Sequence, residues 1–116
     1  GEANLLPGKC IKNGKDGLCK LKTGQEIKLD IPLTFKKDDE LTIFIRPERV
    51  KFSKSKGNSL SKIQEFTYLG NAAHIQIVSN DHIINATLPI DKVKTFHKGD
   101  NIDIEFPKSF SQIINS

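Results

Sequence analysis

Hydrophobic and polar residues alternate along most of the chain with a period of two. Because successive side chains of a β-strand point to opposite faces, this alternation is typical of strands with one buried face. The pattern is clearest in Ile27–Ile31, Leu41–Ile45, His74–Ile77 and Asn101–Phe106. Helical periodicity is confined to a short turn at Ile90–Thr95. We therefore predict an all-β chain of about eight or more short strands, as in sandwiches and barrels.

Polar segments rich in Gly, Asn, Asp and Ser separate these runs. Asn-Gly and Asp-Gly pairs favour tight hairpins because both residue types tolerate a positive φ angle. The segments Asn13–Gly17, Lys22–Gln25 and Ser79–His82 are predicted to be hairpin tips, and Lys54–Ser59 is predicted to be a polar loop.

One pattern occurs twice, as FKKDDELTIFI in Phe35–Ile45 and as FHKGDNIDIEF in Phe96–Phe106. A Phe-x-Lys-x-Asp start precedes three alternating apolar positions in both, and each copy follows an apolar-Pro pair and a hairpin. We predict two tandem copies of one β unit, roughly Leu6–Phe52 and Leu60–Ile114. Each copy alone is too short to bury a stable core, so the two are expected to share one.

The segment Ile43–Val50, IFIRPERV, interrupts a good strand with a proline and three charges. Proline cannot donate a hydrogen bond to a sheet, so it is confined to edges and bends. We expect Arg46, Pro47 and Glu48 to end the last strand of the first copy and to carry the chain into the second half.

The net charge is +4, from 18 Lys and Arg against 14 Asp and Glu, and the lysines are spread along the whole chain. Because nucleic-acid binders concentrate basic residues on one face, a solvated surface is the better interpretation. Phe44, Phe66 and Tyr68 keep single-strand binding as a weaker alternative. No segment resembles a signal peptide or a membrane span. The chain begins at Gly1 rather than Met, and we expect it to be a fragment of a longer protein.

Candidate chemistry is sparse. The phosphate-binding pattern G-x-x-x-x-G-K-[ST] does not occur, and the three histidines lack metal-ligand spacing. Cys10 and Cys19 flank the first hairpin turn symmetrically, so they can face each other; in a reducing compartment they are expected to remain thiols. We predict no catalytic, cofactor-binding or metal-ligating residue, and therefore no enzyme activity in this chain.

Three segments, GEANLLPG, IRPERV and EFTYLGNAAHIQI, together with the turn HKGD, resemble a known family. This is the TOBE (transport-associated OB) domain at the C-terminus of ABC-importer ATP-binding subunits, which serve polyamines, iron(III), sugars, sulfate and molybdate. The residues that carry the resemblance are Gly1, Glu2, Asn4, Arg46, Pro47, Glu48, Tyr68, Leu69, Gly70, Gly99 and Asp100.

The resemblance implies an OB-like or MOP-like β-barrel that is regulatory and non-catalytic. It implies that ATP and Mg bind in a nucleotide-binding domain upstream of residues 1–116. The implied partners are a second ATP-binding subunit in a homodimer, the chain's own nucleotide-binding domain and a membrane permease, with no nucleic acid. The implied location is cytoplasmic, peripheral on the inner membrane. The motifs favour spermidine or putrescine import, with an iron(III) importer as the alternative.

A second hypothesis stays open beside this one. Related β-barrels bind oxyanions such as molybdate between subunits, with backbone N–H groups and Lys or Ser side chains. The loop Lys54–Lys62 offers Ser, Gly and Lys, although a flexible solvated loop explains the same composition.

Overall fold

The computed structural model describes residues 2–114, and Gly1 lies outside the described residues. Within this range ten strands form two five-stranded sheets, with one short α-helix and two 3-10 turns between them. The first half contains β1 Asn4–Lys12, β2 Gly14–Leu21, β3 Glu26–Ile31, β4 Glu40–Ile45, the 3-10 turn η1 Pro47–Arg49 and β5 Lys51–Lys54. The second half contains β6 Ser61–Leu69, β7 Ala72–Ser79, β8 His82–Pro89, α1 Ile90–Val93, β9 Asn101–Glu105, the 3-10 turn η2 Lys108–Phe110 and β10 Gln112–Ile113.

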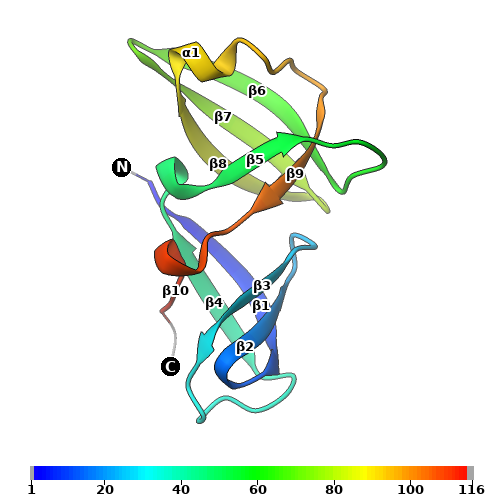
Figure 1. The fold of residues 1–116 in the computed structure, drawn as a ribbon, viewed down its shortest axis with the longest axis vertical. Helices are drawn as coiled ribbons and strands as arrows, with labels where there is room; N and C mark the ends of the chain where they lie inside the picture. The colour runs from blue at the N-terminus through cyan, green and yellow to red at the C-terminus, as the bar shows by residue number, and fades with distance from the viewer. Residues whose placement is uncertain (1, 115–116) are drawn as a thin grey trace.

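The two sheets exchange their last strands. The first sheet has the order β10-β4-β1-β2-β3 and the second has the order β5-β9-β6-β7-β8. Each sheet therefore takes four consecutive strands from one half and its fifth from the other, which Figure 1 shows as two crossings between the lower and upper sheets. All strand pairs are antiparallel. The predicted fold class, an all-β OB-like barrel built from two tandem β repeats, is confirmed, and the repeat boundaries Leu6–Phe52 and Leu60–Ile114 stay a prediction.

The repeated Phe-x-Lys-x-Asp pattern has the same geometry in both halves. The carboxylates of Asp39 and Asp100 each accept a hydrogen bond from the backbone N–H three residues earlier, at 2.8 Å in both cases. The residue before each Asp has a positive φ, 72° at Asp38 and 89° at Gly99. The same turn thus precedes β4 and β9, and it explains why the Asp recurs at this spacing.

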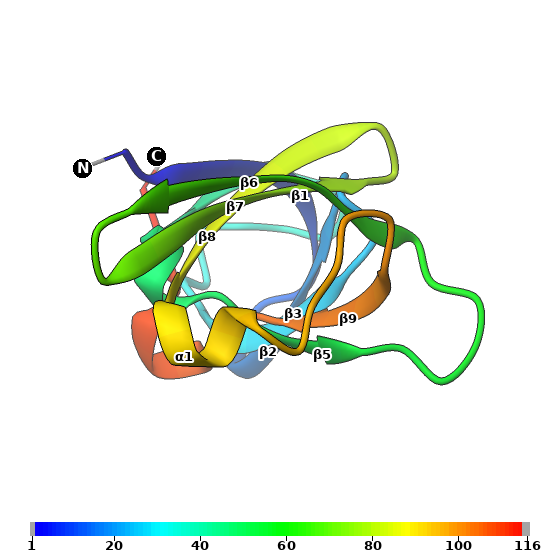
Figure 2. The same cartoon turned by 90° about the horizontal axis from the view of Figure 1, so that it is seen from above.

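A single hydrophobic core joins the two sheets. Leu41, Ile43 and Ile45 of β4 are buried in the first sheet, and Ile75 and Ile77 of β7 are buried in the second, in one contiguous cluster. Burying a branched aliphatic side chain contributes about 1.5–3 kcal/mol, so alternation in these strands is a strong determinant of the fold. Figure 2, which looks along the long axis, shows the strands curling around this interior. No helix within residues 2–114 has the length and apolar character needed to cross a membrane.

Candidate functional site at the junction of the two sheets

The Arg-Pro-Glu segment forms the junction between the two sheets. β4 ends at Ile45, Arg46 is extended, and Pro47 is the buried first residue of η1. The Arg49 N–H donates to the Arg46 carbonyl at 2.9 Å and closes the turn. The fixed φ of proline suits this first helical position, where the missing N–H is not needed. The bend expected here is confirmed, since the chain then enters β5 of the second sheet.

Asn4 connects the start of β1 to the edge strand β8. Its side chain is only 3 % exposed. Its Nδ2 donates to the Asn85 carbonyl at 2.8 Å, and its Oδ1 accepts from the Asn85 N–H at 2.8 Å. A side-chain amide thus pairs with the backbone of an edge strand as a neighbouring strand would, and it satisfies two polar groups that are costly to bury alone.

The Asn85 side chain extends this polar chain outward. Its Oδ1 lies 3.0 Å from His74 Nε2 on the neighbouring strand β7. His74, which the sequence analysis excluded only as a metal ligand, is a half-buried hydrogen-bonding residue. The alternation in residues 74–77 indicates the polar face of the strand for His74. It does not show that Asn85 on β8 lies within hydrogen-bond distance.

Five of the residues that carry the family resemblance line one pocket of about 310 Å³ beside this polar chain, together with His74 and Thr87. The five residues are Glu2, Arg46, Pro47, Glu48 and Leu69. They come from the start of the chain, from η1 and its preceding residue, and from the end of β6. The structure thus brings together segments that are far apart in the sequence, and the functional role of these residues stays a prediction.

The remaining residues of the resemblance lie elsewhere. Tyr68 is 64 % exposed near the end of β6, where its ring stacks 6.4 Å from that of Phe66, and Gly70 follows in the hairpin turn with a φ of 67°. Gly99 and Asp100 lie at the opposite end of β6, where their backbones hydrogen-bond with Ile63. None of these four residues lines the pocket.

The serines of the loop Lys54–Lys62 make internal hydrogen bonds. Ser55 Oγ donates to the Gly57 carbonyl at 3.2 Å, and Ser59 Oγ donates to the Ile102 carbonyl. Lys54 Nζ lies 3.9 Å from Asp100 Oδ2. Ser55, Ser59 and Lys54, which the sequence offered for an oxyanion, therefore have partners within the chain.

Comparison with known proteins adds to this geometry. No family model matches the chain. It is 32 % identical over 79 residues to the spermidine/putrescine import ATP-binding protein PotA of Mesorhizobium japonicum. The chain is a TOBE-type domain of the kind carried by ABC-importer ATP-binding subunits. The match covers 66 % of the domain but 21 % of that protein, so the domain spans about a fifth of the relative's length.

The fold of the TOBE-type domain also occurs in a solved structure. The crystal structure of the cytoplasmic molybdate-binding protein ModG with molybdate bound superposes with a TM-score of 0.78. The superposition covers 95 % of this chain and 94 % of that one at 12 % sequence identity. At this identity the likeness establishes the fold.

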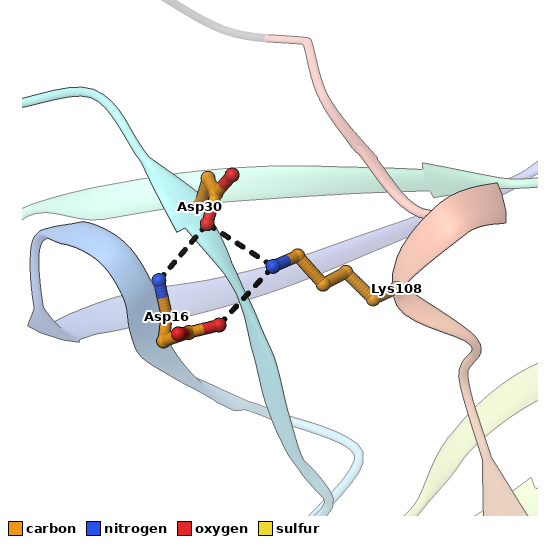
Figure 3. Close-up of polar contacts among 3 residues, drawn as sticks. All are labelled: Asp16, Asp30 and Lys108. Atoms are coloured by element: carbon orange, nitrogen blue, oxygen red, sulfur yellow. Dashed lines mark hydrogen bonds and ion pairs between the residues drawn. The ribbon is translucent and has the colours of Figure 1, made fainter.

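The second crossing between the sheets of the TOBE-type domain has a different polar contact. Lys108 Nζ of η2 lies 3.2 Å from Asp16 Oδ1 and 3.2 Å from Asp30 Oδ1 (Figure 3). The Asp16 N–H donates to Asp30 Oδ1 at 2.9 Å, and this bond, with Lys108, lowers the pKa of Asp30. The two carboxylates raise the pKa of Lys108. No sequence signal links these residues, which are 92 and 78 positions from Lys108.

The two thiols lie opposite each other inside the first sheet. Cys10 and Cys19 are paired across β1 and β2, as the symmetric spacing predicted, and both are fully buried. Burial, with a smaller effect of Cys10, raises the pKa of Cys19 to about 12. Burial also raises the pKa of Cys10, with smaller effects of Asp39 and Asp38. Both thiols are therefore protonated at neutral pH and act as core residues.

Among residues 2–114, no group of three or more His, Cys, Asp or Glu side chains is placed to hold a metal ion.

Proposed function

We propose that the chain is a non-catalytic accessory domain of the ATP-binding subunit of an ABC importer. The match to the spermidine/putrescine import protein PotA carries this proposal, and it favours polyamines as the solute of the parent importer, with iron(III) as the alternative. In this proposal ATP and Mg bind in an upstream nucleotide-binding domain. The subunit works as a homodimer on a membrane permease, at the cytoplasmic face of the inner membrane.

The pocket at the junction supports a contact between this domain and the nucleotide-binding part. Glu2 lies two residues before the start of β1 and lines the pocket with Arg46, Pro47 and Glu48. An upstream domain joined at this point would emerge beside η1. The exposed charges of Arg46 and Glu48, next to the buried Pro47, suit a polar interface that can change with the state of the motor domain.

A reconstituted importer tests the proposal. We expect spermidine, presented with its binding protein, to stimulate ATP hydrolysis by the parent subunit and permease, and iron(III) to leave it unchanged. Glu48→Ala should reduce the stimulation while the domain keeps its melting temperature, and Glu105→Ala, an exposed carboxylate on β9, serves as the matched control. Equal behaviour of the two variants would count against the junction as the point of communication.

A second candidate function is binding of a small oxyanion. The likeness to the molybdate-bound ModG structure along nearly the whole chain favours it. Calorimetric titration of the domain with molybdate, sulfate and phosphate tests this candidate, and an absence of heat with all three would eliminate it.

A further inference from the structure

A pocket of about 520 Å³ lies where η1, η2 and β10 meet the outer side of the first sheet. Arg46 and Arg49 line it together with Ser109, Ser111 and Gln112, and the Ser111 hydroxyl already donates to the Pro107 carbonyl at 2.8 Å. None of the acidic residues in the described part of the chain lines this pocket. The pocket therefore offers positive charge and hydrogen-bond donors without a competing carboxylate.

Aromatic rings hold both guanidinium groups in place. The Arg46 guanidinium lies 5.2 Å from the centre of the Phe44 ring, and that of Arg49 lies 4.0 Å from the centre of the Phe110 ring. A cation–π contact uses the face of the guanidinium and leaves the N–H groups at its edge free to donate. The two arginines are thus oriented before any ligand arrives.

The two arginines differ from the paired lysines of the domain. Lys54, Lys98 and Lys108 each lie within ion-pair distance of a carboxylate. Neither Arg46 nor Arg49 forms an ion pair with a carboxylate of residues 2–114. Their charge is therefore available to an external anion.

The turn at the junction brings the two arginines to the same pocket. The Arg49 N–H donates to the Arg46 carbonyl at 2.9 Å, and both residues line the pocket although Arg46 is extended and precedes η1. Two planar forks in one pocket match the oxygens of a tetrahedral anion better than a single lysine does.

We propose that the pocket between Arg46 and Arg49 binds a small divalent oxyanion of the phosphate class. The proposal rests on the second candidate function for the kind of ligand and gives that function a site outside the loop Lys54–Lys62. It does not depend on the importer assignment. The anion connects η1, which links the two sheets, with η2 and β10 near the other end of the chain, so binding stabilises the junction.

A larger basic pocket of about 730 Å³ is a weaker candidate. Lys9, Lys20 and Lys22 line it, but Asp38 lines it too. Lys20 Nζ already donates to the Gly24 carbonyl at 2.9 Å. Within residues 2–114, the arginine pocket has neither a lining carboxylate nor a guanidinium engaged in an ion pair.

Titration of the domain with phosphate, sulfate and molybdate at constant ionic strength, followed by ¹⁵N–¹H NMR, tests the site. We expect saturable shifts at residues 46–49 and 109–112 with at least one of these anions, and none with chloride. Arg46→Gln and Arg49→Gln should each weaken binding by about tenfold or more, because each removes a charge-assisted donor fork. Lys28→Gln, which removes one exposed charge from β3, should leave the affinity unchanged.

A lysine variant separates the effect of the guanidinium geometry on binding from the effect of its charge. Arg49→Lys keeps the charge, and with it the fold, and should still weaken binding several-fold. If the wild-type domain binds none of the three anions, both the site and the second candidate function are wrong. If it binds and the arginine variants match Lys28→Gln, the site is wrong while oxyanion binding elsewhere survives. Neither result bears on the spermidine-stimulated ATP hydrolysis that tests the importer assignment.

Discussion

The two crossings between the sheets occupy equivalent places and use different chemistry. At one crossing η1 packs against β8, and the buried amide of Asn4 forms two hydrogen bonds with the Asn85 backbone. At the other crossing η2 packs against β3, and the exposed Lys108 lies between Asp16 and Asp30. Buried, satisfied hydrogen bonds contribute more to stability than exposed ion pairs, so equal topology does not mean equal strength.

Loss of Asn4 should have the largest effect. Asn4→Ala leaves the partly buried N–H and carbonyl of Asn85 without their partner, and we expect a loss of about 2–4 kcal/mol in the free energy of unfolding. Urea unfolding measures this, and Asn101→Ala, at an exposed position on β9, is the control. A change below about 0.5 kcal/mol in Asn4→Ala would mean that the amide is not the link between the sheets.

The buried thiols predict a loss of stability in alkali. The folded state holds the Cys19 proton up to a pKa of about 12, whereas the unfolded state releases it from about the ordinary value of 9.0. The contribution of Cys19 to the free energy of unfolding should therefore be constant below pH 9 and then fall by about 1.4 kcal/mol per pH unit. Cys19→Ala should reduce the slope in alkali, and part of it should remain because burial also raises the pKa of Cys10. An identical slope in both proteins would contradict the assignment.

The equivalent turns before β4 and β9 allow a smaller comparison. Gly99 and Asp38 both have a positive φ, which costs a residue with a side chain about 1–2 kcal/mol relative to glycine. Gly99→Ala should therefore destabilise the domain by about that amount, and Asp38→Gly should not destabilise it. Thermal melts of the two variants measure the difference, and melting temperatures that shift down together would show that the turns are not equivalent.

The exposed ion pair should have the smallest effect on stability. Lys108→Gln should leave the unfolding midpoint nearly unchanged but raise the pKa of Asp30 toward its ordinary value, which NMR of the carboxyl carbon detects. Because the folded pKa of Asp30 is lowered, its contribution is present above the unfolded pKa and is lost as pH falls through the folded pKa. If the pKa of Asp30 is the same in the wild type and in Lys108→Gln, the result would contradict the contact in Figure 3.

The fold could be read from the sequence because its signals are local. Alternation in Leu41–Ile45 needs only neighbouring residues, and the Phe-x-Lys-x-Asp spacing reflects hydrogen bonds that span three residues. The contacts that close the barrel are long-range. Asn4 and Asn85 are 81 residues apart, and their pairing depends on where β8 lies after both sheets have formed.

The exchange of the last strands was also beyond the sequence analysis. Nothing in Lys51–Lys54 shows that it pairs with β9 of the other half, although Arg46 and Pro47 did mark the bend that sends it there. Phe44, considered as an aromatic platform for nucleic acid, instead supports the Arg46 guanidinium. That contact joins neighbours in sequence, but cation–π geometry is decided by rotamers that a sequence does not show.

One unfolding experiment tests whether the two tandem sheets form one interlocked body. Tyr68, the only tyrosine, lies in the second sheet, and Cys10 and Cys19 lie inside the first. Tyrosine fluorescence and thiol labelling, followed through the same urea titration, therefore report on different sheets. The shared core and exchanged strands predict coincident midpoints and slopes for the two probes. Two separate transitions would show that the halves fold independently and would contradict the account.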